Sequence, residues 1–288
     1  MRTLIALIAG TVIVTQTDPG RVVADVRHAL GGDAAIAALQ GFAVTGSETH
    51  SAGGHNFSVD TEFLCVLPDR FLHVRRSSSP FGITTEEWGF NGDQHIRRRD
   101  SDMPYPPDPG EHDTPAQKAL RDARTLANAR REFTRVATAM IGLSPIDPVD
   151  VSVAGQQTID GRSTDVLVLR APDGYSANLF IDSTTHLPWM ISWMGAPIVT
   201  ATATSVIAVP RGQSPGRMPE PSFPAMPDPL SLTPVEHQLF FDDYKTADGF
   251  TWPHTLIEKI GGHVTSTVKL GKYKINPSLN PKRFDPSR

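Results

Sequence analysis

The sequence predicts an α+β fold in which a large curled antiparallel β-sheet, a half-open barrel, is covered on its concave face by amphipathic helices. Two observations predict this fold. Alternating apolar and polar residues, separated by short turn sequences, recur in both halves of the chain, and one long stretch with helical spacing divides the halves. About nine to eleven strands are expected, and an open sheet of that size curls.

The first half is expected to contain two short helices followed by four or five strands. Pro19 precedes an amphipathic segment over 21–30, and a second short helix is expected over 34–40. Between residues 42 and 99 the apolar residues recur at every second position, which is typical of strands with one face in the core. Asn91-Gly92 is the strongest hairpin signal of the chain.

The second half is expected to begin with the longest helix and to continue as a series of strands. Thr114 can cap this helix and Pro115 suits its first position, while apolar residues keep helical spacing to about residue 142. Strands are expected over 149–194 and 236–275. Turn sequences such as Asp-Gly separate them at the spacing of a meander.

The expected domain organisation is a single domain over residues 19–288, preceded by a signal peptide or N-terminal apolar segment over 1–18. Arg2 precedes twelve uncharged residues, too few for a membrane span of about 20 residues. We therefore expect a periplasmic protein, which stays anchored at its N-terminus if the segment is not removed. A proline-rich stretch without periodicity indicates an inserted loop at about 195–234.

Composition and motifs argue against catalysis and against nucleic-acid binding. The formal net charge of −4 gives no basic excess, and the single cysteine, Cys65, excludes an internal disulfide. The ten histidines show no metal-ligand spacing. Gly212–Gly216 matches the G-x-S-x-G pattern, but Pro215 lacks the backbone N–H that an oxyanion hole requires. We expect no catalytic residue, no metal, no cofactor and no enzymatic activity.

An apolar cleft enclosed by the curled sheet is the predicted binding site. Large apolar side chains from both halves are expected to line it: Phe57, Phe63, Trp88, Phe90, Phe133, Trp189 and Trp193. Arg130 falls within the apolar stripe of the long helix. It either extends past the edge of the stripe to solvent or points into the cleft toward a ligand headgroup. These assignments depend on strand register, since a slip of one residue exchanges the faces.

Several segments resemble the LolA/LolB-like group of outer-membrane lipoprotein-sorting and carrier proteins of Gram-negative bacteria. In the first half they are Ala29–Gly32, Leu39–Phe42, Leu67–Phe71 and Gly89–Asp93. In the second half they are Ile181–Pro188, Asp243–His254 and Tyr273–Phe284. The resemblance implies a half-open barrel closed by helices, export to the periplasm, an apolar cavity that accepts acyl chains, and no enzymatic activity. No motif locates the family's ligand-gating arginine here.

The leading hypothesis is a monomeric periplasmic carrier whose partner is an acyl lipid or a lipoprotein. The alternative is a non-catalytic envelope scaffold that uses the same fold to bind an envelope protein. An open cavity lined by Phe57, Phe63, Trp88 and Phe90 would favour the carrier, and a filled interior would favour the scaffold. An exported hydrolase would need a histidine to meet an acid and a nucleophile, or a second histidine and an acid, inside the cleft.

Overall fold

The computed structural model describes residues 18–52, 55–80, 82–102, 113–142, 149–197 and 233–288. The predicted N-terminal apolar segment, the G-x-S-x-G match and most of the predicted proline-rich insert lie outside these residues. Within them, no helix is both long and apolar enough to cross a membrane.

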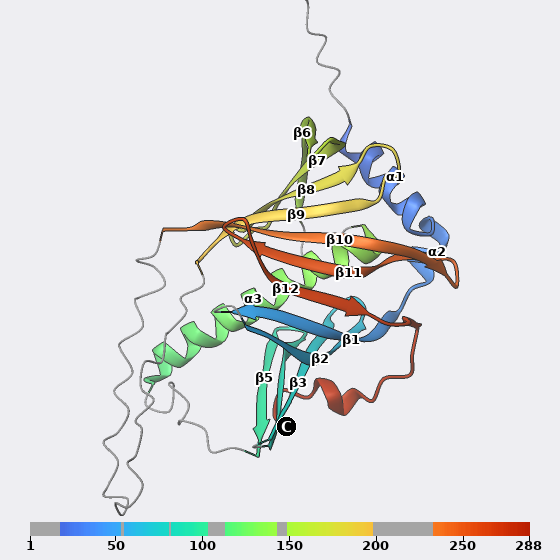
Figure 1. Cartoon of the computed structure of the whole chain (residues 1–288). Coiled ribbons are helices and arrows are strands. Elements are labelled where there is room, and N and C mark those ends of the chain that lie inside the picture. Colours follow the sequence, from blue (N-terminus) through green and yellow to red (C-terminus); the bar gives the residue numbers. More distant parts are fainter. Residues whose placement is uncertain (1–17, 53–54, 81, 103–112, 143–148, 198–232) are drawn as a thin grey trace, which may run out of the picture.

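The predicted fold class is confirmed, because the described strands form one open antiparallel sheet (Figure 1). The first meander consists of β1 (Gly41–Ala52), β2 (His55–Val66), β3 (Arg70–Ser79), β4 (Gly82–Asn91) and β5 (Gln94–Ser101). The second consists of β6 (Asp150–Ile159), β7 (Arg162–Arg170), β8 (Ser176–Asp182), β9 (Pro188–Gly195), β10 (Val235–Ala247), β11 (Phe250–Ile260) and β12 (His263–Leu270). A short β13 (Lys274–Ile275) pairs with β1.

The described sheet has 13 strands, more than the nine to eleven expected. The end of the expected strand region over 236–275 holds two strands, β12 and β13, and all five strands of the first meander form. The meanders join where β1 pairs with β12, which leaves β5 and β6 as the two edges. Since neither edge pairs with the other, the barrel stays half open.

The helix α3 (Pro115–Ile141) connects these two edges across the concave face of the sheet. Thr114 and Gln117 form a capping box at its start, which confirms the predicted N-terminus. Its 27 residues extend over about 40 Å, long enough to cross the sheet. Figure 1 shows α3 behind the strands, with the sheet curving around it. The helix therefore packs against both meanders.

Two shorter helices and well-formed turns complete the predicted framework. The helices α1 (Pro19–Leu30) and α2 (Asp33–Ala38) precede β1. The turns at Asp160-Gly161 and Asp248-Gly249 have positive φ at both residues, which is the type I′ geometry that suits the twist of a hairpin.

The concave face carries the main core, and part of the convex face is covered by the C-terminal segment. Met140 of α3 accepts a hydrogen bond at its backbone oxygen from Trp252 Nε1, 2.8 Å away. On the opposite face, Phe284 of the short helix η2 (Pro281–Phe284) is buried against Leu72 and Ile96. The first meander is thus covered on both faces.

Candidate functional site

An apolar cavity of about 280 Å³ lies between α3 and the end of β7. We call it the apolar cavity. The residues of α3 that line it recur at helical spacing. They are Ala123, Leu126, Ala127, Arg130, Arg131 and Thr134. Its other side is formed by Val149, Leu169, Ala171, Pro172, Asp173 and Tyr175. Small alanines on α3 face the turn between β7 and β8, and this leaves the space unfilled.

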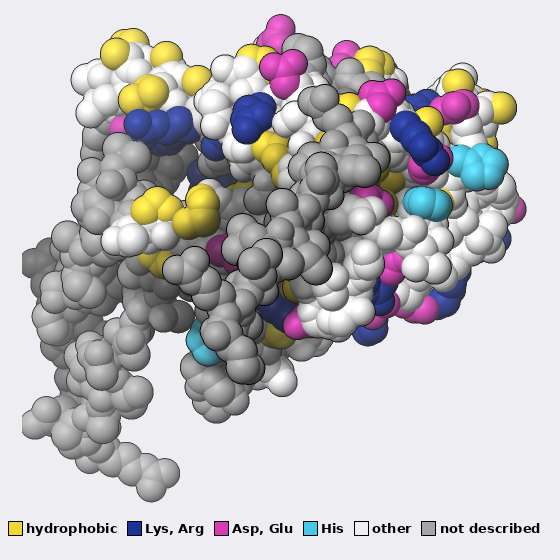
Figure 2. Space-filling model, turned by 90° about the horizontal axis from the view of Figure 1, so that it is seen from above, with side chains coloured by type: hydrophobic (Ala, Val, Ile, Leu, Met, Phe, Trp, Pro, Cys, Tyr) yellow, Lys and Arg dark blue, Asp and Glu magenta, His cyan; other side chains and the backbone are white. Residues whose placement is uncertain are grey.

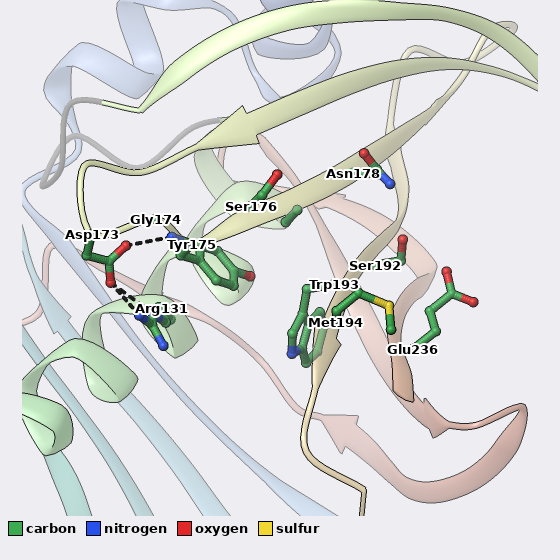
Figure 3. A pocket seen from close by; sticks show the side chains of 11 residues that line it. Arg131, Asp173, Gly174, Tyr175, Ser176, Asn178, Ser192, Trp193, Met194 and Glu236 are labelled. Carbon is green, nitrogen blue, oxygen red and sulfur yellow. Dashed lines mark hydrogen bonds and ion pairs between the residues drawn. The ribbon is translucent and has the colours of Figure 1, made fainter. Parts of the chain in front are cut away.

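A second, more open cavity of about 440 Å³ lies beside the first and is lined mainly by polar residues (Figure 3). We call it the polar cavity. It is formed by the start of β8, the end of β9 and the start of β10, together with Arg131 of α3. Trp193, Met194, Ser192 and Glu236 lie on its β9–β10 side, opposite Asp173 and Tyr175.

Arg131, Asp173 and Tyr175 line both cavities and form the partition between them. Arg131 donates to Asp173 Oδ2 from Nε (3.0 Å) and Nη2 (2.6 Å), and its guanidinium lies 5.4 Å from the centre of the Tyr175 ring. Burial raises the pKa of Asp173, but hydrogen bonds from the Tyr175 backbone N–H and from Arg131 lower it more, so the pKa lies below its ordinary value. The partition is therefore an ion pair at neutral pH.

Arg130 connects the wall of the apolar cavity with the first meander. Its Nη2 donates to the backbone oxygen of Gly92 (3.2 Å) and to Asp93 Oδ1 (2.8 Å) in the turn between β4 and β5. Its Nε is buried and has no hydrogen-bond partner in the described part of the chain. The side chain thus lines the cavity along its length and ends at an exposed carboxylate.

Three of the predicted aromatic residues lie together in a closely packed core. Phe63, Phe90 and Phe133 have at most 2% of their surface exposed, and Phe71 lies among them. The ring of Phe133 meets Phe71 and Phe90 edge-on, at centroid distances of 5.3 and 5.8 Å. None of these side chains lines either of the two cavities, so this part of the interior is filled.

Trp88 belongs to a polar cluster that ties α3 to the first meander. Its Nε1 donates to Glu132 Oε2, and His73 Nδ1 donates to Glu132 Oε1 at 2.6 Å. Burial raises the pKa of Glu132, but the interactions with His73 and Trp88 lower it more, and the net pKa is below the ordinary value. The carboxylate therefore stays ionised and accepts both hydrogen bonds.

The same cluster has the residue types of a nucleophile, base and acid but not their accessibility. Thr61 Oγ1 lies 2.8 Å from His73 Nε2, opposite the bond to Glu132. Thr61 is 2% and His73 3% exposed, and the imidazole lies between the rings of Phe63 and Trp88, 4.2 Å from each centroid. A substrate would have to displace the core to reach Thr61, so we assign the cluster to structure.

The remaining predicted residues lie in three separate places. Phe57 is 53% exposed near the start of β2 and stacks on His50. Trp189 packs edge-on against Phe240 in a cluster apart from the main core. Trp193 borders the polar cavity, with the Arg135 guanidinium 4.3 Å from its ring centre. The structure therefore does not bring the eight predicted residues into one cleft, and a role of each in lipid contact stays a prediction.

Sequence reasoning missed the partition and the β7–β8 side of the cavities. Neither Arg131 nor Asp173 was among the residues predicted to line the cleft. The alanines of α3 beside Arg130 were the available signal, because small residues within an apolar stripe leave room opposite them. Within the described residues, no group of three or more His, Cys, Asp or Glu side chains could hold a metal ion.

The fold and site together define an open antiparallel half-barrel with a helix across its concave face and cavities under that helix. No protein-family model matches the chain, and no curated protein matches it by sequence. A DUF1329 family protein from Desulfovibrio piger is 11% identical with a TM-score of 0.51, and the match covers 94% of this chain and 99% of that chain. At this identity the similarity shows a common fold.

Structures from the group suggested by the sequence motifs are also among the matches. A LolA superfamily protein from Nitrosomonas europaea is 11% identical with a TM-score of 0.49, covering 94% of this chain and 99% of that chain. A domain named for outer-membrane lipoprotein sorting, from Vibrio parahaemolyticus, is 10% identical with a TM-score of 0.48, covering 94% and 98%.

Proposed function

We propose that this protein is a non-catalytic carrier of the cell envelope that binds an acyl chain of a lipid or lipoprotein in the apolar cavity. The observation that carries the proposal is the cavity itself, about 280 Å³ bounded mostly by aliphatic side chains of α3 and β7. Each methylene moved from water into such a space contributes about 0.8 kcal/mol, so part of one chain is enough for useful affinity. The motif resemblance supports the same class of ligand.

A periplasmic location is part of the proposal and rests on the N-terminal sequence. Twelve uncharged residues after Arg2 are typical of an export signal. The intact mass of the chain from its native envelope fraction would show whether residues 1–18 are removed. Organic extraction of the same sample, prepared without detergent, would show any bound lipid.

A pair of tryptophan variants on α3 tests the cavity directly. Ala127 lines the apolar cavity, whereas Ala119 is exposed on the same helix and lines neither of the two cavities. Ala127→Trp should fill the cavity and weaken binding of a fluorescent monoacylglycerol by about tenfold or more. Ala119→Trp should bind like the unmodified chain. Equal binding by both variants, with both folded by circular dichroism, would reject the apolar cavity as the acyl site.

A scaffold that binds an envelope protein is the second candidate, and one observation favours it. The interior around Phe63, Phe90 and Phe133 is filled, so the first meander offers no room for a ligand there. Absence of any extracted lipid, together with no uptake of the fluorescent monoacylglycerol, would favour this candidate over the carrier.

A further inference from the structure

The two edge strands of the sheet differ in charge. β5 carries four charged residues in succession, Arg97, Arg98, Arg99 and Asp100, whereas the nine residues Val151–Ile159 of β6 carry none. Charged side chains on an edge strand oppose pairing with a further strand, and proteins commonly protect their edges in this way. β5 is therefore protected, and β6 has the composition of an edge that accepts another strand.

The surroundings of the two edges differ in the same sense. Arg98 of β5 donates from Nη1 and Nη2 to the backbone oxygens of Asp285 and Arg283, so the C-terminal segment is bound beside that edge. No residue of β6 is buried, and within the described part of the chain β7 is its one strand neighbour. Figure 2 shows the molecule from the side on which β6 and α1 lie in Figure 1, and acidic and basic side chains are mixed over the described surface there.

A β-bulge divides β6 into two parts. It lies between Val153 and Gly155, where the register with β7 shifts. Bulges twist an edge strand and can themselves hinder pairing, so the bulged part is the less suitable one. From Gly155 to Ile159 each residue has its own partner on β7, and the backbone is regular. The regular part offers a continuous edge of five residues.

The hairpin turn after β6 fixes which backbone groups of this part point outward. Ile159 and Arg162 flank the two-residue turn Asp160-Gly161, so they exchange backbone hydrogen bonds. Such pairs alternate along a ladder with pairs that form no hydrogen bond, and the next pair is Thr158 with Ser163. The N–H and C=O groups of Thr158 therefore point away from β7, and its side chain is exposed.

The start of β6 lies at the boundary of the apolar cavity. Val149, the residue directly before β6, lines the cavity. Leu169 lines it from β7, and this residue is the partner of Val151 on β6. An acyl chain in the apolar cavity thus lies next to the first residues of the unpaired edge. A peptide attached to that chain needs about eight extended residues to reach from Asp150 to Thr158.

We propose that β6 is a second binding site, which takes the peptide of an acylated protein as an additional strand while the acyl chain occupies the apolar cavity. This inference rests on the proposed function. Backbone hydrogen bonds along the edge provide affinity that does not depend on the peptide's exact sequence. Because Val151–Ile159 carry no charge, the peptide that fits is an extended, uncharged segment.

Three ligands with the same acyl chain test the proposal on the full, delipidated chain. The first is palmitoyl joined to the N-terminus of an uncharged ten-residue peptide of Ser, Thr, Val and Gln. The second is the same molecule methylated at each backbone nitrogen, so it cannot donate to β6. The third is monopalmitoylglycerol, which has no peptide. Titrated below their micelle concentrations, the first ligand should bind about tenfold tighter than the second.

Hydrogen exchange locates the peptide without any variant. The outward-facing amides of residues 155–159 should exchange about tenfold more slowly when the first ligand is bound, because the added strand accepts their hydrogen bonds. Monopalmitoylglycerol should leave their exchange unchanged. The backbone amides of β5 serve as the internal control and should respond to neither ligand.

A pair of variants at one exposed position tests the edge directly. Thr158→Pro removes an N–H that β7 does not use, a change that edge strands tolerate. It should weaken binding of the first ligand by about fivefold and leave monopalmitoylglycerol unaffected. Thr158→Ala keeps the N–H and should bind like the unmodified chain. If Thr158→Pro does not fold, hydrogen exchange of the unmodified chain still decides.

The outcomes separate this inference from the function on which it rests. Equal affinity for the first two ligands, or unchanged exchange over 155–159, overturns the edge site and leaves acyl binding intact. Failure to bind any of the three ligands overturns the proposed carrier. Slow exchange of these amides in the free chain, together with a dimeric mass that Thr158→Pro makes monomeric, would show that a second copy occupies β6, and this also overturns the proposal.

Discussion

The same helix meets the two meanders in different ways. Toward β3 and β4, α3 presents Phe133 and Glu132, which fill the space with an aromatic cluster and a buried carboxylate. Toward β7, it presents Ala127 and Leu126 and leaves two cavities with their shared partition. The first meander is also covered on its convex face by Phe284. One half of the barrel is therefore a filled framework, and the other half contains the cavities in which we propose that the ligand binds.

The largest expected effect on the free energy of unfolding distinguishes the filled core of the first meander from the side of α3 that lines the apolar cavity. Phe133→Ala removes a fully buried ring and should lower the free energy of unfolding by about 3–5 kcal/mol. Leu126→Ala enlarges a space that already exists, and should cost about 1 kcal/mol. Urea unfolding at neutral pH measures both. Similar losses in the two variants would contradict the distinction between the halves.

A second prediction concerns the carboxylate that ties α3 to the first meander. Glu132 has a pKa below the ordinary 4.5 in the folded chain, so it stabilises the fold above that pH. The contribution is lost as pH falls from about 4.5 through the folded pKa. Glu132→Gln should lower the free energy of unfolding at neutral pH by about 1–3 kcal/mol, because it removes the charge from two buried hydrogen bonds.

Unfolding at several pH values measures this effect. The difference between the unmodified chain and Glu132→Gln should shrink as the solution is acidified, since protonation removes the same charge. Glu86→Gln is the control, because its carboxylate forms only a partly exposed pair with Arg99 on β5. A difference that stays constant down to acid pH would show that Glu132 is not the titrating group.

Most of the fold could be predicted from local sequence signals. The capping box at Thr114, the Asp160-Gly161 turn and the apolar alternation of β2 are each set by neighbouring residues, and each is present in the structure. The number of strands was underestimated. Nothing local marks the division of β12 from β13, which follows from their separate pairing with β1.

The candidate site could be predicted only in part, because a cavity depends on residues that pair across the fold. Arg130 was identified from its place in the apolar stripe, and it does line the apolar cavity. Phe90 was chosen for its size, but large side chains fill space, and it is completely buried. Tyr175 and Asp173 meet Arg131 only when the β7–β8 turn reaches α3, and no spacing in the sequence shows that contact.

The smallest expected effect on stability comes from two adjacent arginines of α3 that reach opposite halves of the barrel. Arg130 pairs with Asp93 in the first meander, and Arg131 pairs with Asp173 in the second. Asp173 is 40% exposed, so Asp173→Asn should change the free energy of unfolding by only about 0.2–1 kcal/mol. The same variant leaves Arg131 uncompensated at the partition.

Urea unfolding measures this effect. Asp93→Asn makes the matched change beside Arg130, and because Asp93 is 96% exposed it should cost no more than Asp173→Asn. If Asp173→Asn instead unfolds the chain, the partition is part of the rigid framework, and the division between a filled half and a binding half is wrong.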